Sequence, residues 1–127
     1  MATMVLEKDA ATIPTSDELV ARAAAMVPLL RARADEIEKA RQVPHDVVQM
    51  FKDAGFFRIV QPKKYGGWEM NPVVFMRVLS ELGRGCCASA WVMMILGVHN
   101  WEFGLMDDRA APLPERRGSP STAQVSP

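Results

Sequence analysis

The 127-residue sequence lacks several features that mark special classes of protein. Its 15 basic residues balance its 15 acidic ones, so no basic excess points to nucleic acid or to an anionic membrane surface. The longest apolar run, residues 90–98, is too short to cross a membrane, which takes about 20 residues. The first residues have neither the basic start nor the sustained apolar core of a signal peptide. We therefore expect a soluble cytoplasmic protein that binds neither nucleic acid nor membrane.

Cysteine is scarce, and its placement excludes two common uses of the residue. The two cysteines, Cys86 and Cys87, are adjacent in the sequence. Neighbouring residues make a poor disulfide, and two thiols without further Cys or His partners make no zinc site. We interpret both as small buried residues in a reduced compartment, and we expect no bound metal.

The spacing of apolar residues predicts an all-α protein. Thr15 and Glu18 fit a capping box that begins a first helix, which should reach about Arg41. Pro28 falls inside this helix and should kink it, because it removes a backbone donor. On the charged face, pairs such as Glu18 with Arg22 have the spacing of helical ion pairs.

Glycine and proline set the expected bounds of three further helices. Pro44 suits the start of a second helix and Gly55 the residue after its end, while Asn71 can cap a third. Between them, FFRIVQP at 56–62 predicts a short extended segment. The fourth helix spans about residues 86–106 and is apolar nearly all round, so we expect it to be buried centrally. The result is a four-helix unit.

Composition divides the chain into three parts. Residues 1–14 are polar and unpatterned, which indicates a flexible arm. Residues 15–111 carry the helical periodicity and form the domain. Residues 112–127 contain several prolines and no apolar periodicity, so they cannot bury enough surface to offset chain entropy and should be disordered.

The end of the fourth helix carries polar side chains that a buried helix does not need. His99 shares a helical face with Leu96, and Trp91 lies about two turns earlier. A histidine there is either a satisfied core residue, which is the commoner outcome, or part of a pocket wall. An imidazole can hydrogen-bond a phenol, and an indole offers a flat face to an aromatic ring. The spacing alone leaves both interpretations open.

Two longer motifs carry a family resemblance. AGFFRIVQPKKYGG and ELGRGCCASAW together resemble the N-terminal domain of the acyl-CoA dehydrogenase superfamily, over about residues 19–111. Within it, Trp68-Glu69-Met70 and the pair Trp91 and His99 are similar to the oxygenase components of two-component flavin-dependent monooxygenases. Those oxygenases hydroxylate phenols such as 4-hydroxyphenylacetate.

The resemblance implies a function and a set of site residues. Trp91 would border a flavin, His99 would be the catalytic residue that hydrogen-bonds the substrate hydroxyl, and Asn100 would bind the substrate or orient His99. It also implies reduced flavin (FMN or FAD) delivered by a separate flavin reductase, a phenolic substrate and a homo-oligomer.

The resemblance also has a limit. The family continues into a β-barrel and a C-terminal helical bundle, whereas this chain leaves the family pattern near Ala111. It therefore resembles a truncated or frame-shifted product, and we expect it to bind no flavin and to be inactive alone, because a pocket needs its other walls. Two alternatives stay open: a fragment of an acyl-CoA dehydrogenase, and a non-enzymatic helical interaction module.

Overall fold

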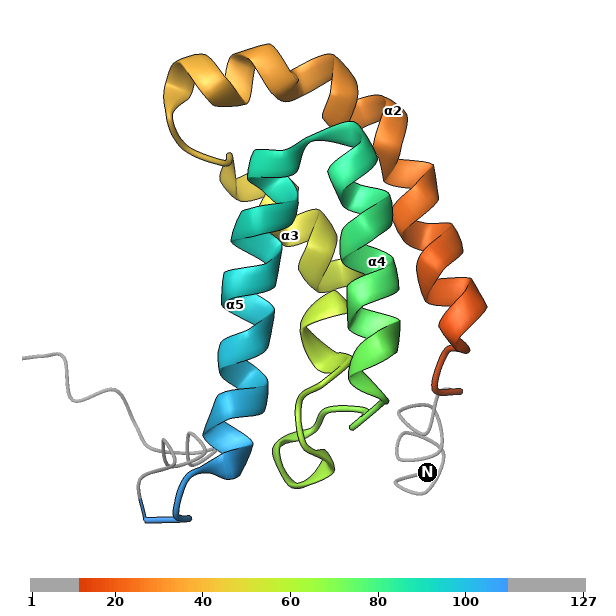
Figure 1. Ribbon diagram of the computed structural model, residues 1–127, viewed down its shortest axis with the longest axis vertical. Coiled ribbons are helices and arrows are strands. Elements are labelled where there is room, and N and C mark those ends of the chain that lie inside the picture. The colour runs from red at the N-terminus through yellow and green to blue at the C-terminus, as the bar shows by residue number, and fades with distance from the viewer. Residues whose placement is uncertain (1–11, 110–127) are drawn as a thin grey trace, which may run out of the picture.

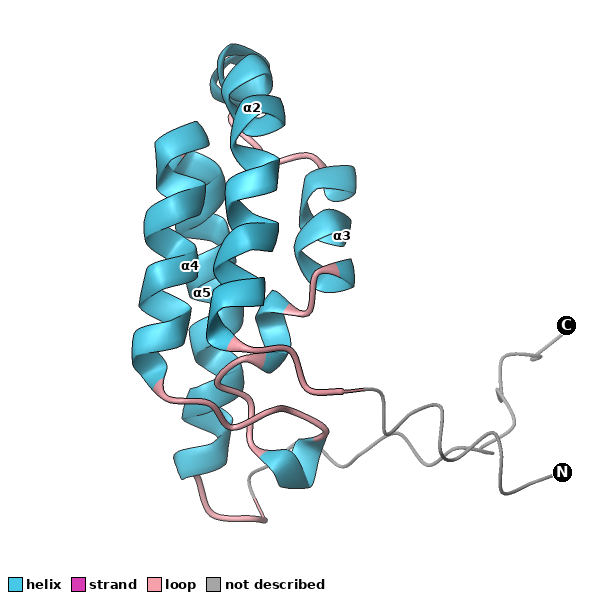
Figure 2. Cartoon of the chain, turned by 90° about the vertical axis from the view of Figure 1, so that its right-hand side faces the viewer, coloured by secondary structure: helices cyan, strands magenta, loops and turns pink. Residues whose placement is uncertain are grey.

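The computed structural model describes residues 12–109, which form four α-helices and two short 3-10 turns without a strand (Figure 1, Figure 2). The α-helices are α2 (Ser16–Ala40), α3 (His45–Asp53), α4 (Pro72–Gly85) and α5 (Cys87–Leu105), and the 3-10 turns are η1 (Phe56–Arg58) and η2 (Lys63–Tyr65). The predicted all-α class is confirmed. The expected tail and most of the expected N-terminal arm lie outside the described residues.

Local caps set where two helices begin. Thr15 Oγ1 accepts a hydrogen bond from the Glu18 amide at 3.2 Å, and the Glu18 carboxylate accepts one from the Thr15 amide at 2.7 Å. Asn71 Oδ1 accepts from the Val73 amide at 2.9 Å at the start of α4. Pro28 lies inside α2, and the helix changes direction partway along its length (Figure 1). The capping box and the Asn71 cap are therefore confirmed, and the bend agrees with the expected kink.

The segment FFRIVQP is not extended as predicted. It begins with the 3-10 turn η1, after Gly55 with φ 83. The Trp68 and Met70 amides donate to the carbonyls of Arg58 and Ile59, both at 2.8 Å, so the following loop folds back on this segment. Short apolar runs do not distinguish a strand from a buried turn, which explains the error.

The core lies where α2 packs along α4, with α5 beside α4 and with α3 and η1 behind them (Figure 1, Figure 2). Its fully buried large side chains come from all of these elements: Leu19 and Leu30 of α2, Phe51 of α3, Phe56 of η1, Leu82 of α4 and Met93 of α5. Burial of this apolar surface supplies the main favourable term for folding.

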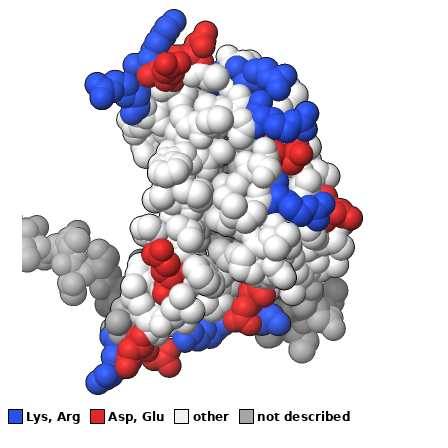
Figure 3. Space-filling view, viewed as in Figure 1, with Lys and Arg blue, Asp and Glu red and all other residues white. Residues whose placement is uncertain are grey.

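α5 is not buried on all sides, which contradicts the expectation from its composition. Met93 and Gly97 face inward and are buried, but Trp91 is 63% exposed and Leu105 is 70% exposed. Figure 3 shows a surface over α4 and α5 that is largely free of charged side chains. A groove of about 280 Å³ runs along this surface; we call it the α4–α5 groove, lined by Met76, Leu79, Ser80, Gly83, Cys87, Ala90, Trp91 and Met94. The apolar helix thus faces solvent where the described residues offer nothing to cover it.

The two cysteines also differ in burial. Cys86 is buried, as predicted, but Cys87 is exposed, and both thiols are free. Cys86 is the extended residue that joins α4 to α5, whereas Cys87 is the first residue of α5, so the two side chains point into different surroundings. The interpretation of both as buried residues was therefore wrong for Cys87.

Two arginines of α2 donate to backbone carbonyls of other elements. Arg22 Nη1 donates to the carbonyl of Ala54 at 3.0 Å, and Arg31 Nη2 donates to the carbonyl of Arg84 at 3.1 Å. These carbonyls lie at the ends of α3 and α4, where backbone acceptors lack helical partners. The predicted pair of Glu18 with Arg22 is not formed, because Arg22 has a backbone acceptor and Glu18 caps its helix.

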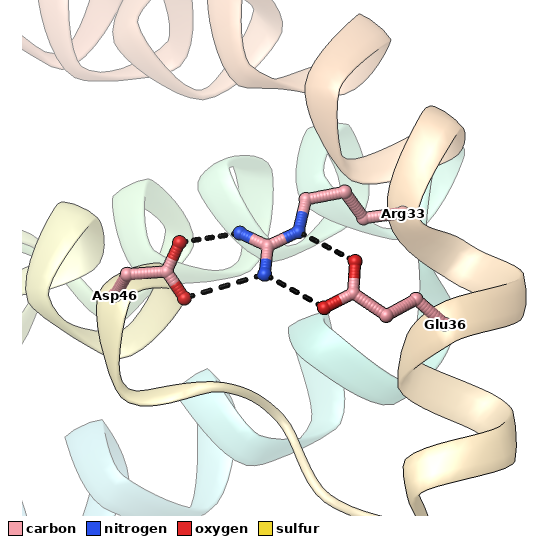
Figure 4. Close-up of polar contacts among 3 residues, drawn as sticks. All are labelled: Arg33, Glu36 and Asp46. Carbon is pink, nitrogen blue, oxygen red and sulfur yellow. Dashed lines mark hydrogen bonds and ion pairs between the residues drawn. The ribbon is translucent and has the colours of Figure 1, made fainter.

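Arg33 links α2 to the first turn of α3 (Figure 4). Its Nη1 lies 2.5 Å from Asp46 Oδ2, and its Nη2 lies 3.0 Å from Glu36 Oε1. Hydrogen bonds from the guanidinium lower the pKa of both carboxyl groups below their ordinary values, and the same bonds raise the pKa of Arg33. One guanidinium therefore joins two helices across the short 41–44 turn.

This link should make stability depend on pH. A carboxyl group whose pKa is lowered by folding stabilises the fold above its unfolded pKa, and the gain is lost as the pH falls through the folded value. The ordinary pKa values are 4.5 for Glu36 and 3.8 for Asp46, so the loss should occur below them. We expect the melting temperature of Arg33→Gln to lie below that of the parent at pH 7, and the difference to shrink as the pH falls below the ordinary pKa values of the two carboxyl groups. A difference that stays constant from pH 7 to 3 would contradict this assignment.

Candidate functional site

The three candidate residues all lie on α5 but do not share one pocket. Trp91 and His99 are eight residues apart, which on an α-helix is about 12 Å along the axis and roughly 80° around it. Trp91 lines two surface grooves, and neither groove includes His99 or Asn100 among its described lining residues. Any single ligand that contacts both Trp91 and His99 must therefore extend along the helix.

Trp91 stands as a ridge between its two grooves. One is the α4–α5 groove, and the other, of about 330 Å³, lies between the end of α2 and the start of α5. The second groove combines an apolar floor from Ile37, Val43 and Val92 with polar side chains from Glu38, Arg41 and Gln42. Because the indole is 63% exposed, its face is available for stacking on a planar ring.

His99 lies on the solvent side of α5. Its side chain is 55% exposed, and its Nδ1 lies 3.7 Å from Oε2 of Glu102, one turn further along. Leu96 and Phe103, spaced three and four residues from it, are exposed as well. Within the described residues the core interpretation of His99 is thus wrong, and the interpretation as a wall residue stays open.

Asn100 is used by the fold itself. Its Nδ2 donates to the carbonyl oxygen of Phe57 in η1 at 3.1 Å, and the bond is partly buried. The structure pairs His99 with Glu102, not with Asn100. Sequence reasoning missed the link to Phe57, because a backbone acceptor 43 residues away leaves no signal in the amino-acid pattern.

The Trp68-Glu69-Met70 motif has a structural role. The Trp68 ring lies so close to Gly55 that a Cβ there would come within 2.2 Å of it. The Arg58 guanidinium carbon lies 5.0 Å from the Trp68 ring centroid, within range of a cation–π contact. This motif therefore fixes the 63–71 loop against η1, at a distance from Trp91 in the chain.

Two further classes of site are absent from the described residues. Within residues 12–109, His, Cys, Asp and Glu do not gather in groups of three or more that could hold a metal ion. No helix in that range is both long and apolar enough to cross a membrane. What α5 presents chemically is the indole of Trp91 and the imidazole of His99, together with Trp101 and Glu102, among exposed apolar side chains.

The arrangement of these helices, with α5 beside α4 and the 56–71 segment folded beneath them, defines a known class of domain. The family described as "Acyl-CoA dehydrogenase, N-terminal domain" matches residues 16–114, and the chain belongs to it.

Comparison with individual proteins shows which members of this family the chain is similar to. The chain is 38% identical over 86 residues to "Flavin-dependent monooxygenase, oxygenase subunit HsaA" of Rhodococcus jostii, which covers 68% of this chain and 22% of that protein. It is 30% identical over 80 residues to "p-hydroxyphenylacetate 3-hydroxylase, oxygenase component" of Acinetobacter baumannii, covering 63% of this chain and 19% of that protein. The crystal structure of the HsaA monooxygenase from M. tuberculosis matches with a TM-score of 0.72 at 34% identity, covering 76% of this chain and 27% of that chain.

These relatives confirm the resemblance drawn from the sequence motifs. They are oxygenase components of flavin-dependent monooxygenases, and the chain spans only about 22% of the length of the first of them. The activity, substrates and partners of such proteins are therefore matters of proposal for this chain.

Two tryptophans of similar chemistry should respond differently to truncation. Trp68 packs on Gly55 and under Arg58, so Trp68→Ala should cost about 2–4 kcal/mol of unfolding free energy. Trp91→Ala should cost less than about 0.5 kcal/mol, because the indole is mostly exposed. Urea unfolding of both variants measures the difference. A large loss for Trp91→Ala would show that this indole holds the fold together and is not free to contact a ligand.

Proposed function

We propose that this chain is the N-terminal helical domain of an oxygenase component that hydroxylates a phenol with reduced flavin and O2. The observation that carries the proposal is the surface of α5. The indole of Trp91 and the imidazole of His99 are exposed on a largely apolar helix, in a chain 38% identical to the oxygenase subunit of a flavin-dependent monooxygenase. Exposed aromatic and imidazole groups of this kind suit a pocket wall for planar ligands.

The residues present fit one wall of a flavin site. Trp91 would lie against the flavin, FMN or FAD, and Arg41 and Gln42 are polar side chains of the groove beside it. When bound, the flavin supplies the oxygen chemistry, and the protein supplies positioning. A flavin has several ring nitrogens and oxygens and a phosphate to satisfy, which these few groups do not achieve alone. The chain by itself should therefore bind flavin poorly and be inactive.

This expectation is tested by equilibrium titration of the purified chain with reduced FMN and reduced FAD. We expect no saturation at micromolar flavin, because one wall of a pocket buries too little of the ligand. Stoichiometric binding of either flavin would contradict the proposal that Trp91 contributes a single wall.

His99 would hydrogen-bond the hydroxyl of the phenol. With Nδ1 turned toward Glu102, Nε2 is the nitrogen left to a substrate. An imidazole that accepts a hydrogen bond from a phenol raises the electron density of the ring, one that donates to a phenolate stabilises the deprotonated form, and either bond orients the ring. Leu96 and Phe103, on either side along the helix, would exclude water from the ring.

The proposal includes partners and a compartment. A separate flavin reductase would deliver the reduced flavin, and the oxygenase would assemble as a homo-oligomer. The uncovered α4–α5 groove supports burial of this surface against further protein, since exposed apolar patches commonly mark interaction sites. Both thiols are free, which fits the reducing cytoplasm.

The function is tested by a chimera in which residues 16–109 replace the matching segment of the Rhodococcus jostii oxygenase subunit. Phenol hydroxylation by this chimera, with its reductase and NADH, supports the proposal. A folded chimera without hydroxylation would reject it. Acyl-CoA oxidation by a matching dehydrogenase chimera would then favour the acyl-CoA dehydrogenase alternative, and failure of both would favour the interaction module.

In the active chimera, His99→Ala should weaken binding of the phenol. Loss of one hydrogen bond to a charged or polarised hydroxyl costs about 1.5–3 kcal/mol, or roughly ten- to a hundredfold in affinity. NADH consumption should continue while less product forms. His45→Ala is the matched control, because His45 is the exposed first residue of α3 and is distant in the chain from α5. Unchanged phenol affinity in His99→Ala would remove this residue from the site.

A further inference from the structure

The C-terminal half of α5 carries two rows of residues, an inward stripe that faces the domain and an outward stripe that faces solvent. Each residue of the outward stripe directly precedes a residue of the inward stripe in the sequence. The inward stripe consists of Gly97, Asn100 and Gly104, and the outward stripe consists of Leu96, His99 and Phe103. Each stripe has spacings of three and four residues, so each occupies one side of the helix. The direction in which His99 projects is therefore set by whatever holds the inward stripe in place.

The two glycines let the helix backbone approach its neighbours closely. A Cβ on Gly97 would lie 2.7 Å from the Phe75 ring, and a Cβ on Gly104 would lie 2.3 Å from Cγ of Pro62. Real Cβ atoms do not come that close to their neighbours, so a larger residue at either position would force Phe75, Pro62 or α5 to shift. Such packing sets the distance of α5 from α4 and from the 56–62 segment, but a smooth backbone contact does not by itself fix rotation about the helix axis.

Asn100 contributes the directional contact of the inward stripe. Its Nδ2 donates to the Phe57 carbonyl at 3.1 Å from a partly buried position between the two glycines. A hydrogen bond weakens steeply when its angle departs from linearity, whereas an apolar contact tolerates sliding. The carbonyl belongs to the 3-10 turn η1, which the 67–70 loop holds by its own backbone bonds.

We propose that Asn100 is a positioning residue whose bond to Phe57 fixes the rotation of the C-terminal half of α5 and so the direction of His99. The role for His99 rests on the proposed function, whereas the rotation is a property of this chain. A rotation of roughly 20° carries a side-chain tip, about 5–6 Å from the axis, through roughly 2 Å. Asn100 then acts through the fold and does not touch the substrate, so of its two predicted roles the proposal keeps the orientation of His99 and leaves out substrate binding.

The rotation is tested by NMR of the full chain, with no need for activity. The parent should show proton cross-peaks between Gly97 and the Phe75 ring and between Gly104 and Pro62. Asn100→Ala should lose the Gly104–Pro62 cross-peak and shift the His99 ring signals. The matched control is Asn71→Ala, which removes the side-chain hydrogen bond that caps α4. The control should keep both cross-peaks and the His99 signals.

Every result of this comparison decides the proposal. Unchanged cross-peaks and His99 signals in Asn100→Ala would overturn it, and equal changes in Asn71→Ala would show a general loss of stability instead. If Asn100→Ala does not fold, Asn100→Asp keeps the shape and removes the donor, and it must show the same losses. Unfolding of both variants would make Asn100 a stability residue and would reject the positioning role.

Catalysis supplies an independent second measurement. In an active chimera, Asn100→Ala should lower kcat/KM for the phenol about a hundredfold, the effect expected for a misplacement of about 1 Å, while Asn71→Ala should leave it near the parent value. Partial recovery in Asn100→Gln, which keeps the amide donor, would support action through the Phe57 bond. An inactive parent chimera would reject the proposed function but leave the NMR result on rotation valid.

Discussion

The candidate site depends on the contact of α5 with α4 and with the segment 56–62. Gly97 and Gly104 allow the approach, and the Asn100 amide adds one directional bond to η1. This contact holds the C-terminal half of α5 on the domain and orders its exposed side. The positions of His99 and of the apolar groups around it depend on it, because side chains on one helix move together.

Charged side chains of α2 connect this helix to other elements of the domain. Arg22, Arg31 and Arg33 leave α2 to reach α3 and the end of α4, through two backbone carbonyls and one carboxylate. The guanidinium suits this task, because its fixed fork of donors reaches carbonyl and carboxylate acceptors with defined geometry. In Figure 3 most charged side chains lie toward the edges, and the surface over α4 and α5 carries few of them.

That apolar surface links the fold to the proposed function. The chain matches about 22% of the length of its first curated relative, so much of what accompanies this domain there has no counterpart among the described residues. Met76, Trp91 and Leu96 are exposed on helices whose other sides form the core. A surface of this kind gains free energy when further protein or a planar ligand covers it, at roughly 25 cal/mol per Å² of apolar area.

The sequence by itself determined the features that depend on neighbours three or four residues apart. The capping box at Thr15, the Asn71 cap, the four helices and the family motifs were all predictable, because each is a local pattern. Only the tertiary structure decided which side of α5 faces the core, that η1 is a turn, and that Asn100 bonds to Phe57. These depend on backbone groups and ring faces contributed from dozens of residues away. An apolar helix with no polar side gives no periodic signal of its own orientation. Which of its sides is buried is therefore decided by the elements that pack against it.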